Sequence, residues 1–317
     1  MTAFKKRRIA TIDIGSNALL MLVAERGENG SLSVLADVSR IPRLGEDLRR
    51  TRRIAPAAME RSLNVLREYT DQARSLGALE IFATATNAAR EAENRDDFLA
   101  AASSVVGSRV ELLPPGEEAR LTYLSATSED VGDTPSMVVD IGGGSTEITW
   151  GLGNRFDGGR SLDLGTIKLI EGPLTGNPPG TREIDSARRE IDERLARITP
   201  IGSLSRHYGT AGSFTHLAAV DLGIRDYHPD RVAHHKLTPE RVRFWIDKFS
   251  GVEREEISKI PGVDPRRADV ILASSLIIER LLDKFRVPAF EVMDRGIRFG
   301  KLFDTLRGFQ PPVIYPS

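Results

Sequence analysis

The sequence contains the same short pattern twice: a strand-like apolar run, an aspartate, an isoleucine, a glycine turn and a second apolar run. The first copy is Asp13-Ile-Gly-Ser-Asn17 and the second is Asp140-Ile-Gly-Gly-Gly144. The two aspartates lie 127 residues apart, which excludes a short-period repeat protein. The pattern predicts two domains of common design that face each other across a cleft, each beginning with a strand, a turn and a strand.

Composition limits the class of protein. The 317 residues suit two domains, and 40% hydrophobic with 28% charged residues is typical of a globular chain. The absence of cysteine excludes disulfides and thiolate metal sites, and it fits a cytoplasmic protein. The net charge of −1 gives nucleic acid no overall attraction, and the apolar stretches fall far short of the roughly 20 residues that span a bilayer. We therefore expect neither a nucleic-acid nor a membrane partner.

Hydrophobic spacing and turn residues predict an α/β chain. Strands are expected over residues 9–15, 18–25, 31–38, 80–84, 109–113, 136–139 and 289–293, and helices over 56–76, 96–106, from 117 on, 183–198, 213–222, 238–249 and 267–285. Residues 172–180, rich in proline and glycine, predict a loop. The five histidines have no partners at metal-ligand spacing and are interpreted as surface or loop residues.

The glycine turns suggest a site for phosphate. Consecutive backbone N–H groups in a turn form a concavity for anions, and glycines let a phosphate approach them closely. The expected phosphate contacts in the two turns are Gly15, Ser16, Asn17, Gly142, Gly143, Gly144 and Ser145. The alternative is a pair of ordinary tight hairpins whose glycines only satisfy the turn geometry.

Acidic residues flank both turns and suggest a metal ion. A carboxylate beside a phosphate repels it unless a cation lies between them, and Mg²⁺ prefers oxygen ligands. Asp140, Glu147 and Asp13 are therefore the expected ligands of Mg²⁺ or another divalent cation. Two opposed turns of this kind describe a site for phosphoryl chemistry.

Taken in order, several motifs resemble those of the exopolyphosphatase and guanosine pentaphosphate phosphatase (Ppx/GppA) family, within the actin-like ATPase superfamily. The matching segments are residues 13–17, 115–119, 140–147, 209–213 and 267–269. The resemblance implies two actin-like (ribonuclease H-like) domains, each a mixed five-stranded sheet with helices. The expected division is 1–125 for the first domain, with 298–317 packing back on it, and 126–297 for the second. It also implies the short form without an appended helical domain, and a homodimer.

The resemblance further implies site residues. Glu118 matches the catalytic glutamate, which orients the attacking water or takes its proton; the alternative is an ordinary acid in the first turn of a helix. Arg90 matches an arginine near the phosphates; the alternative is a solvated surface residue.

Two further segments are candidates for phosphate contact. Thr210, Gly212 and Ser213 lie in a glycine turn that leads into a helix N-terminus, where Ser213 as a simple N-cap is the alternative. Arg267 is expected at the start of a long helix, as a phosphate ligand or as an ion-pair partner of Asp264 or Asp269.

The function that these residues predict is Mg²⁺-dependent hydrolysis of the terminal phosphoanhydride of inorganic polyphosphate, releasing orthophosphate. The alternative is the same chemistry on the 5′-phosphate of guanosine pentaphosphate, and more distant alternatives are an actin-like kinase and a non-catalytic sensor of guanosine tetra- or pentaphosphate. The basic runs at residues 5–8 and 49–53 are typical of solvated faces, or they guide a long polyanion.

Overall fold

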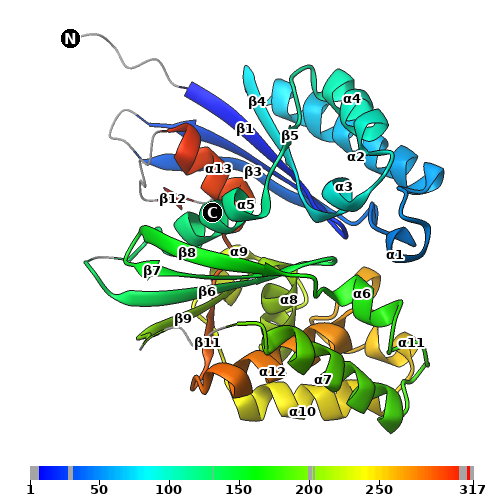
Figure 1. Ribbon diagram of the computed structural model, residues 1–317. Coiled ribbons are helices and arrows are strands. Elements are labelled where there is room, and N and C mark those ends of the chain that lie inside the picture. The colour runs from blue at the N-terminus through cyan, green and yellow to red at the C-terminus, as the bar shows by residue number, and fades with distance from the viewer. Residues whose placement is uncertain are drawn as a thin grey trace. The chain divides into compact units, whose positions relative to one another are not determined.

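The computed structural model in Figure 1 describes residues 7–27, 31–130, 132–198, 202, 204–306 and, for the backbone, 313–314. The chain divides into two compact units, Met1–Leu121 with Ile297–Ser317, and Thr122–Gly296. Part of the basic run at 5–8 and most of the C-terminal segment after residue 306 lie outside the described residues.

The first unit is built on a six-stranded mixed sheet in the order β12-β3-β2-β1-β4-β5. Neighbours β1, β2 and β3 are antiparallel, whereas β4 runs parallel to β1, β5 to β4 and β12 to β3. The strands are β1 (Arg7–Ile14), β2 (Leu19–Arg26), β3 (Leu32–Arg40), β4 (Glu80–Ala85), β5 (Glu111–Leu112) and β12 (Val313–Ile314). Its helices are α1 (Leu48–Thr51), α2 (Pro56–Ser75), α3 (Asn87–Glu91), α4 (Arg95–Val106) and α13 (Ile297–Thr305).

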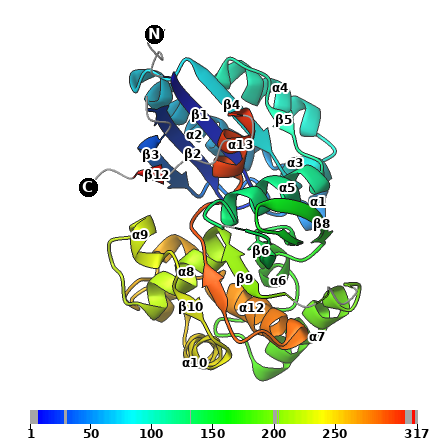
Figure 2. The ribbon, with the colours of Figure 1, turned by 90° about the vertical axis from the view of Figure 1, so that its left-hand side faces the viewer.

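Alternation along β1 explains why helices cover both faces of this sheet. Ala10 and Ile12 belong to the core beneath α2 and α4, which supply Leu66 and Phe98, while Ile9 points to the opposite face. There it joins Phe303 of α13, the red helix that Figure 2 shows beside β1. The last described helix therefore completes the core that the first strand opens.

The second unit repeats the plan with the order β10-β11-β9-β6-β7-β8. Neighbours β6, β7 and β8 are antiparallel, β9 is parallel to β6, β11 is parallel to β9, and β10 is antiparallel to β11. The strands are β6 (Pro135–Ile141), β7 (Thr146–Leu152), β8 (Arg155–Leu162), β9 (Arg206–Thr210), β10 (Lys236–Leu237) and β11 (Phe290–Val292). The helices are α5 (Pro115–Ala126), in which the two units divide, α6 (Thr166–Ile170), α7 (Thr181–Leu195), α8 (Ala211–Asp221), α9 (Pro229–Val232), α10 (Pro239–Ser250), α11 (Arg254–Ile257) and α12 (Ile271–Phe285).

Both sheets share one arrangement: three antiparallel strands, then two that run parallel to the first. This is the mixed five-stranded sheet of a ribonuclease H-like, actin-like domain, so the predicted fold class is confirmed. A two-residue edge strand, β12 in one unit and β10 in the other, makes each sheet six-stranded.

Two sequence predictions were wrong in the second unit. The long helix expected from residue 267 begins at Ile271, because Pro265–Arg267 form a separate 3₁₀ turn. His216, expected at the surface or in a loop, is buried on α8 with 8% of its surface exposed. Its neighbours on α8 are buried all round, so no amphipathic pattern revealed this.

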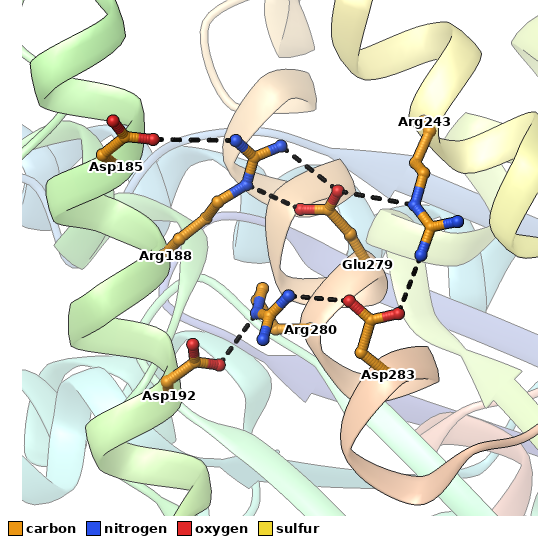
Figure 3. A network of polar contacts seen from close by, with 7 residues as sticks. All are labelled: Asp185, Arg188, Asp192, Arg243, Glu279, Arg280 and Asp283. Atoms are coloured by element: carbon orange, nitrogen blue, oxygen red, sulfur yellow. Dashed lines mark hydrogen bonds and ion pairs between the residues drawn. The ribbon is translucent and has the colours of Figure 1, made fainter.

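Charged side chains join three helices of the second unit. Figure 3 shows that the carboxylate of Glu279 on α12 accepts two hydrogen bonds from Arg188 of α7. Their N···O distances are 2.8 and 3.2 Å, and Arg243 Nε on α10 lies 3.9 Å from Glu279 Oε1. Within the described ranges, no helix is both long and apolar enough to cross a membrane.

Candidate functional site

The repeated sequence pattern folds into the same turn in both units. In the first unit the N–H of Gly15 donates to Ala18 O at 3.0 Å, and in the second the N–H of Gly142 donates to Ser145 O at 2.9 Å. A Cβ on Gly142 would stand 3.2 Å from Ser145 O. The hairpin alternative therefore accounts for Gly142, but it does not account for the two glycines that follow.

Gly143 and Gly144 form a backbone surface suited to an anion. Their N–H groups donate no hydrogen bond to any other described residue, although both residues are buried. The Gly143 carbonyl, by contrast, accepts from the N–H of Ile167 at 2.9 Å, which fixes the loop. Gly165 packs so closely that a Cβ on it would stand 2.3 Å from Gly143 O. A Cβ on Gly165 would also stand 2.5 Å from Gly144 N, so Gly165 packs against both residues of the loop. The loop is thus fixed in place, and its two N–H groups remain candidate donors to an anion.

Asp140 and Glu147 face each other across β6 and β7. They are Cα partners in the antiparallel register, so their side chains lie on one face of the sheet. Both are buried, with 7% and 2% of their surface exposed. The hydroxyl of Ser161 on β8 donates to Glu147 Oε1 at 2.7 Å. Sequence reasoning missed Ser161, because its contact depends on the register of β7 with β8.

The first unit differs at the corresponding place. Asp13 occupies the position in β1 that Asp140 occupies in β6, but the residue opposite Asp13 on β2 is Leu20. Of the two repeated turns, only the one in the second unit is therefore flanked by two facing carboxylates. Within the described part of the chain, no cluster of three or more histidine, aspartate or glutamate side chains is arranged to hold a metal ion.

The turn of the first unit holds two unsatisfied polar atoms. Among the described residues, Ser16 Oγ and Asn17 Oδ1 are buried and have no hydrogen-bond partner. Leaving buried polar atoms unsatisfied is costly, so a polar ligand is expected to satisfy them. The backbone of the same turn is anchored, since Gly45 N–H donates to Ser16 O at 2.8 Å and Arg43 N–H to Asn17 O at 3.1 Å.

Glu118 and Arg90 form a buried ion pair in the first unit. Glu118 has 5% of its surface exposed, and its Oε2 accepts from Arg90 Nη1. Arg90 also donates to Leu113 O at 2.9 Å. Burial raises the pKa of the Glu118 carboxyl above its ordinary value, and the Arg90 guanidinium opposes part of this rise. A raised pKa in a fixed carboxylate is what a general base near neutral pH requires.

The adjacent Glu117 behaves differently. Its carboxylate makes a bidentate pair with Arg120, at 2.7 and 2.9 Å, and Arg120 also reaches Asp304. Both partners of this pair are about one-third exposed. The alternative of an ordinary first-turn acid therefore describes Glu117, while Glu118 has a separate environment.

Thr210 and Ser213 direct their hydroxyls at backbone carbonyls. Thr210 Oγ1 donates to Arg295 O and Ser213 Oγ to Ile141 O, both at 2.8 Å. The helix α8 begins at Ala211 with Thr210 as its N-cap residue, so Ser213 is not the N-cap. These two hydroxyls tie the turn to the end of β6 and to the segment after β11.

Arg267 lies against Gly212. A Cβ on Gly212 would stand 2.2 Å from Arg267 Nη1, so a larger residue here would displace the guanidinium. Asp264, a predicted rival partner, pairs with Arg266 at 2.7 Å. The half-buried guanidinium of Arg267 makes no hydrogen bond or ion pair with any residue that the structure describes. Burial lowers the pKa of Arg267, yet a guanidinium remains cationic. The arrangement leaves a positive charge available to an anion.

Comparison with known proteins identifies relatives along nearly the whole chain. A sequence model of the Ppx/GppA phosphatase family matches residues 22–309. Exopolyphosphatase 2 of Mycobacterium tuberculosis is 32% identical over 291 residues, which covers 88% of this chain and 91% of that protein. Exopolyphosphatase 1 of Mycobacterium bovis is 28% identical over 308 residues, covering 94% and 88%. The crystal structure of the Aquifex aeolicus Ppx/GppA family member superposes with a TM-score of 0.81 at 31% identity, covering 96% of this chain and 98% of that one.

Proposed function

The chain belongs to the Ppx/GppA phosphatase family, and on this basis we propose that it is a divalent-cation-dependent exopolyphosphatase. It would hydrolyse the terminal phosphoanhydride of inorganic polyphosphate and release orthophosphate. The observation that carries the proposal is the buried carboxylate of Glu118, fixed by Arg90 and given a raised pKa by burial. The names of the mycobacterial relatives support the choice of polyphosphate as substrate.

Glu118 would orient the attacking water and accept its proton. Hydrolysis of a phosphoanhydride needs an in-line water and a group to position it, because the transferred phosphoryl itself requires little covalent assistance. Arg90 would hold the carboxylate in place, since its guanidinium also donates to Leu113 O and is thereby fixed. In this assignment Arg90 positions the base, and its charge lies beside the reacting phosphate.

Each of the two glycine turns would supply contacts to phosphate. The N–H groups of Gly143 and Gly144 are suited to phosphate oxygens, as are the unsatisfied side chains of Ser16 and Asn17. Arg267 would add a cationic contact in the second unit. The remaining predicted contacts, Gly15, Gly142, Ser145, Thr210, Gly212 and Ser213, would shape these turns.

Asp140 and Glu147, with Asp13, would hold Mg²⁺ or another divalent cation. The donors fit a hard cation, because two carboxylates lie on one face of β6 and β7 and carboxylate oxygens are the ligands it prefers. When bound, the cation would neutralise charge on the phosphoryl oxygens. We also infer a cytoplasmic homodimer, in line with the family.

Phosphate release from the purified protein tests the proposal. Long-chain polyphosphate, guanosine pentaphosphate and ATP are compared in parallel, with Mg²⁺ and with excess EDTA. We expect Mg²⁺-dependent release from polyphosphate that exceeds release from the two nucleotides. Faster phosphate release from guanosine pentaphosphate would identify that nucleotide as the substrate in place of polyphosphate. Undiminished activity in EDTA would show that the three carboxylates do not bind a required metal ion.

A further inference from the structure

A strongly basic segment lies beside the glycine turn of the first unit. Residues 40–53, here called the basic segment, contain six arginines and two acids, which gives a net charge of +4 in a chain whose net charge is −1. The segment begins at Arg40, the last residue of β3, and includes the short helix α1 (Figure 1). Such a concentration of charge calls for a binding partner or a structural reason.

Both ends of the basic segment are tied to elements that carry candidate site residues. At its start, the N–H groups of Arg43 and Gly45 donate to the backbone of the turn at Ser16 and Asn17. At its end, Arg52 O accepts from the N–H of Glu93 at 2.9 Å, two residues after α3, the helix that contains Arg90.

Asn94 strengthens this second attachment. Its side chain exchanges two hydrogen bonds with the backbone of Ile54, at 2.9 and 3.0 Å. Leu44 and Leu48 are buried within the segment and anchor it to the core. The segment is therefore a fixed bridge between two parts of the candidate site within one unit.

The backbone of the basic segment is strained. Arg43, Asp47 and Arg52 have φ values of 57°, 58° and 57°, in the left-handed region that side chains with a Cβ disfavour. Glycine would adopt this conformation without cost, yet charged residues occupy all three positions. Strain that persists beside a site is held there by surrounding contacts and commonly serves the site.

Four arginine side chains of this segment reach the solvent. Arg49, Arg50, Arg52 and Arg53 are all exposed. Arg50 reaches Asp47 at 3.4 Å and Arg53 reaches Glu93 at 3.9 Å, and more than half of each of these side chains is exposed. Exposed pairs of this kind are weak and are easily exchanged for a stronger anion. Arg52 makes no ion pair within the described part of the chain.

We propose that the basic segment binds the distal phosphates of a long inorganic polyphosphate chain whose terminal phosphate lies at the turn of residues 15–18. This inference rests on the proposed function, and in it the basic segment would give the enzyme its preference for long polyphosphate chains. A polyanion suits a segment with several exposed arginines, because each phosphate that is neutralised releases a counterion and so favours binding. The segment has no aromatic residue on which a base would stack, which favours the inorganic chain over a nucleotide.

The test compares two triple variants with the same charge change. Arg50→Gln/Arg52→Gln/Arg53→Gln removes three positive charges from the segment, and Arg182→Gln/Arg189→Gln/Arg197→Gln removes three exposed ones from α7 and the turn after it. Binding of long-chain polyphosphate is measured by calorimetry at several salt concentrations. KM and kcat are measured for long-chain polyphosphate and for tripolyphosphate.

For the segment variant we expect about tenfold weaker binding of the long chain near 0.1 M salt and a shallower salt dependence, from the loss of three phosphate contacts. Its kcat, and its KM for tripolyphosphate, should stay within about twofold of wild type. The α7 variant should bind like wild type. Arg50→Lys/Arg52→Lys/Arg53→Lys keeps the charges and should retain most of the affinity. This result would show that the glutamine variant binds weakly because it lost charge and not because it is misfolded.

Equal losses in both triple variants, or no loss in the segment variant, would overturn the inference. Failure of the proposed function gives a different result: wild-type protein would bind long polyphosphate through the segment yet release no phosphate from it. The binding measurement therefore tests whether the segment binds polyphosphate, and the phosphate-release measurement tests whether the protein hydrolyses it.

Discussion

The guanidinium of Arg267 occupies the space that a side chain at Gly212 would need, since a Cβ there would stand 2.2 Å from Nη1. Glycine at this place therefore leaves room for a cation that lies beyond α9, α10 and α11 in the sequence. This differs from the expected role of Gly212 as a direct phosphate contact, and it makes the pair testable together.

Gly212→Ala should displace Arg267 and weaken phosphate binding by roughly tenfold, the usual effect of losing one charge-assisted contact. Arg267→Gln should cost about the same, and the double variant should lose little more, because both changes remove one interaction. Binding of orthophosphate and KM for polyphosphate are the measurements. Gly251→Ala is the control, since a Cβ there meets Asp247 O at an ordinary 3.7 Å. Additive losses in the double variant would contradict the coupling.

Glu118→Gln should lower turnover by about 10²–10⁴-fold, the usual contribution of a general base, with little change in KM. Glu117→Gln makes the same charge change but affects a pair with Arg120 that is about one-third exposed, so it should stay within a few-fold of wild type. Because a base acts when deprotonated, kcat of the wild type should rise with pH through the raised pKa of Glu118. Glu117→Gln should keep that rising limb. Equal losses in the two variants would indicate general electrostatics at the start of α5.

Ser161→Ala should raise the Mg²⁺ concentration needed for half-maximal activity by about tenfold, because Glu147 loses the hydrogen bond that orients it. The activity at saturating Mg²⁺ should recover most of its wild-type value. Ser258→Ala, which removes a hydroxyl that donates to Glu255 O, is the matched control and should leave the requirement unchanged. An unchanged requirement in Ser161→Ala would remove Glu147 from cation binding.

His216 should make the folded state sensitive to acid. Burial and the nearby charge of Arg267 lower its pKa to about 3. The unfolded chain, with an ordinary histidine pKa near 6.5, therefore binds more protons between pH 6.5 and 3, and stability is lost as the pH falls through this window. The loss from this group is at most about 1.4 kcal/mol per pH unit. His216→Gln keeps an acceptor for the N–H of Asp264 and should show a shallower dependence in urea unfolding between pH 7 and 5. The same slope in both proteins would contradict the assignment.

Glu279→Gln should lower the free energy of unfolding by about 2 kcal/mol, because it leaves Arg188 and Arg243 facing a neutral group in a buried position. The value is below that of a fully buried pair, since both arginines are partly exposed. Asp185→Asn is the control: its contact with Arg188 is 3.9 Å long and half-exposed, so its removal should have little effect. Urea unfolding at pH 7 compares the two, and phosphate release should be unaffected in both. Equal stabilities would show that the network of Figure 3 contributes little.

Local pattern determined much of this protein. The repeated Asp-Ile-Gly turns, the alternation in β1 and the helical spacing of α2 are each set by residues close in sequence, so the two-unit α/β plan could be predicted. The carboxylate pair could also be proposed, because Asp140 and Glu147 flank one tight turn. A hairpin register follows from its turn, so local sequence places both side chains.

The tertiary structure decided how the remaining residues are used. The pairing of Glu118 with Arg90 joins positions 28 residues apart, and the contact of Ser161 with Glu147 depends on how β8 aligns with β7. The sequence predicted Arg267 at the start of a long helix. In the structure it lies in a 3₁₀ turn against Gly212, and Asp264 pairs with Arg266. Burial, pKa and choice of partner arise from contacts between segments distant in sequence, and a one-dimensional pattern does not encode them.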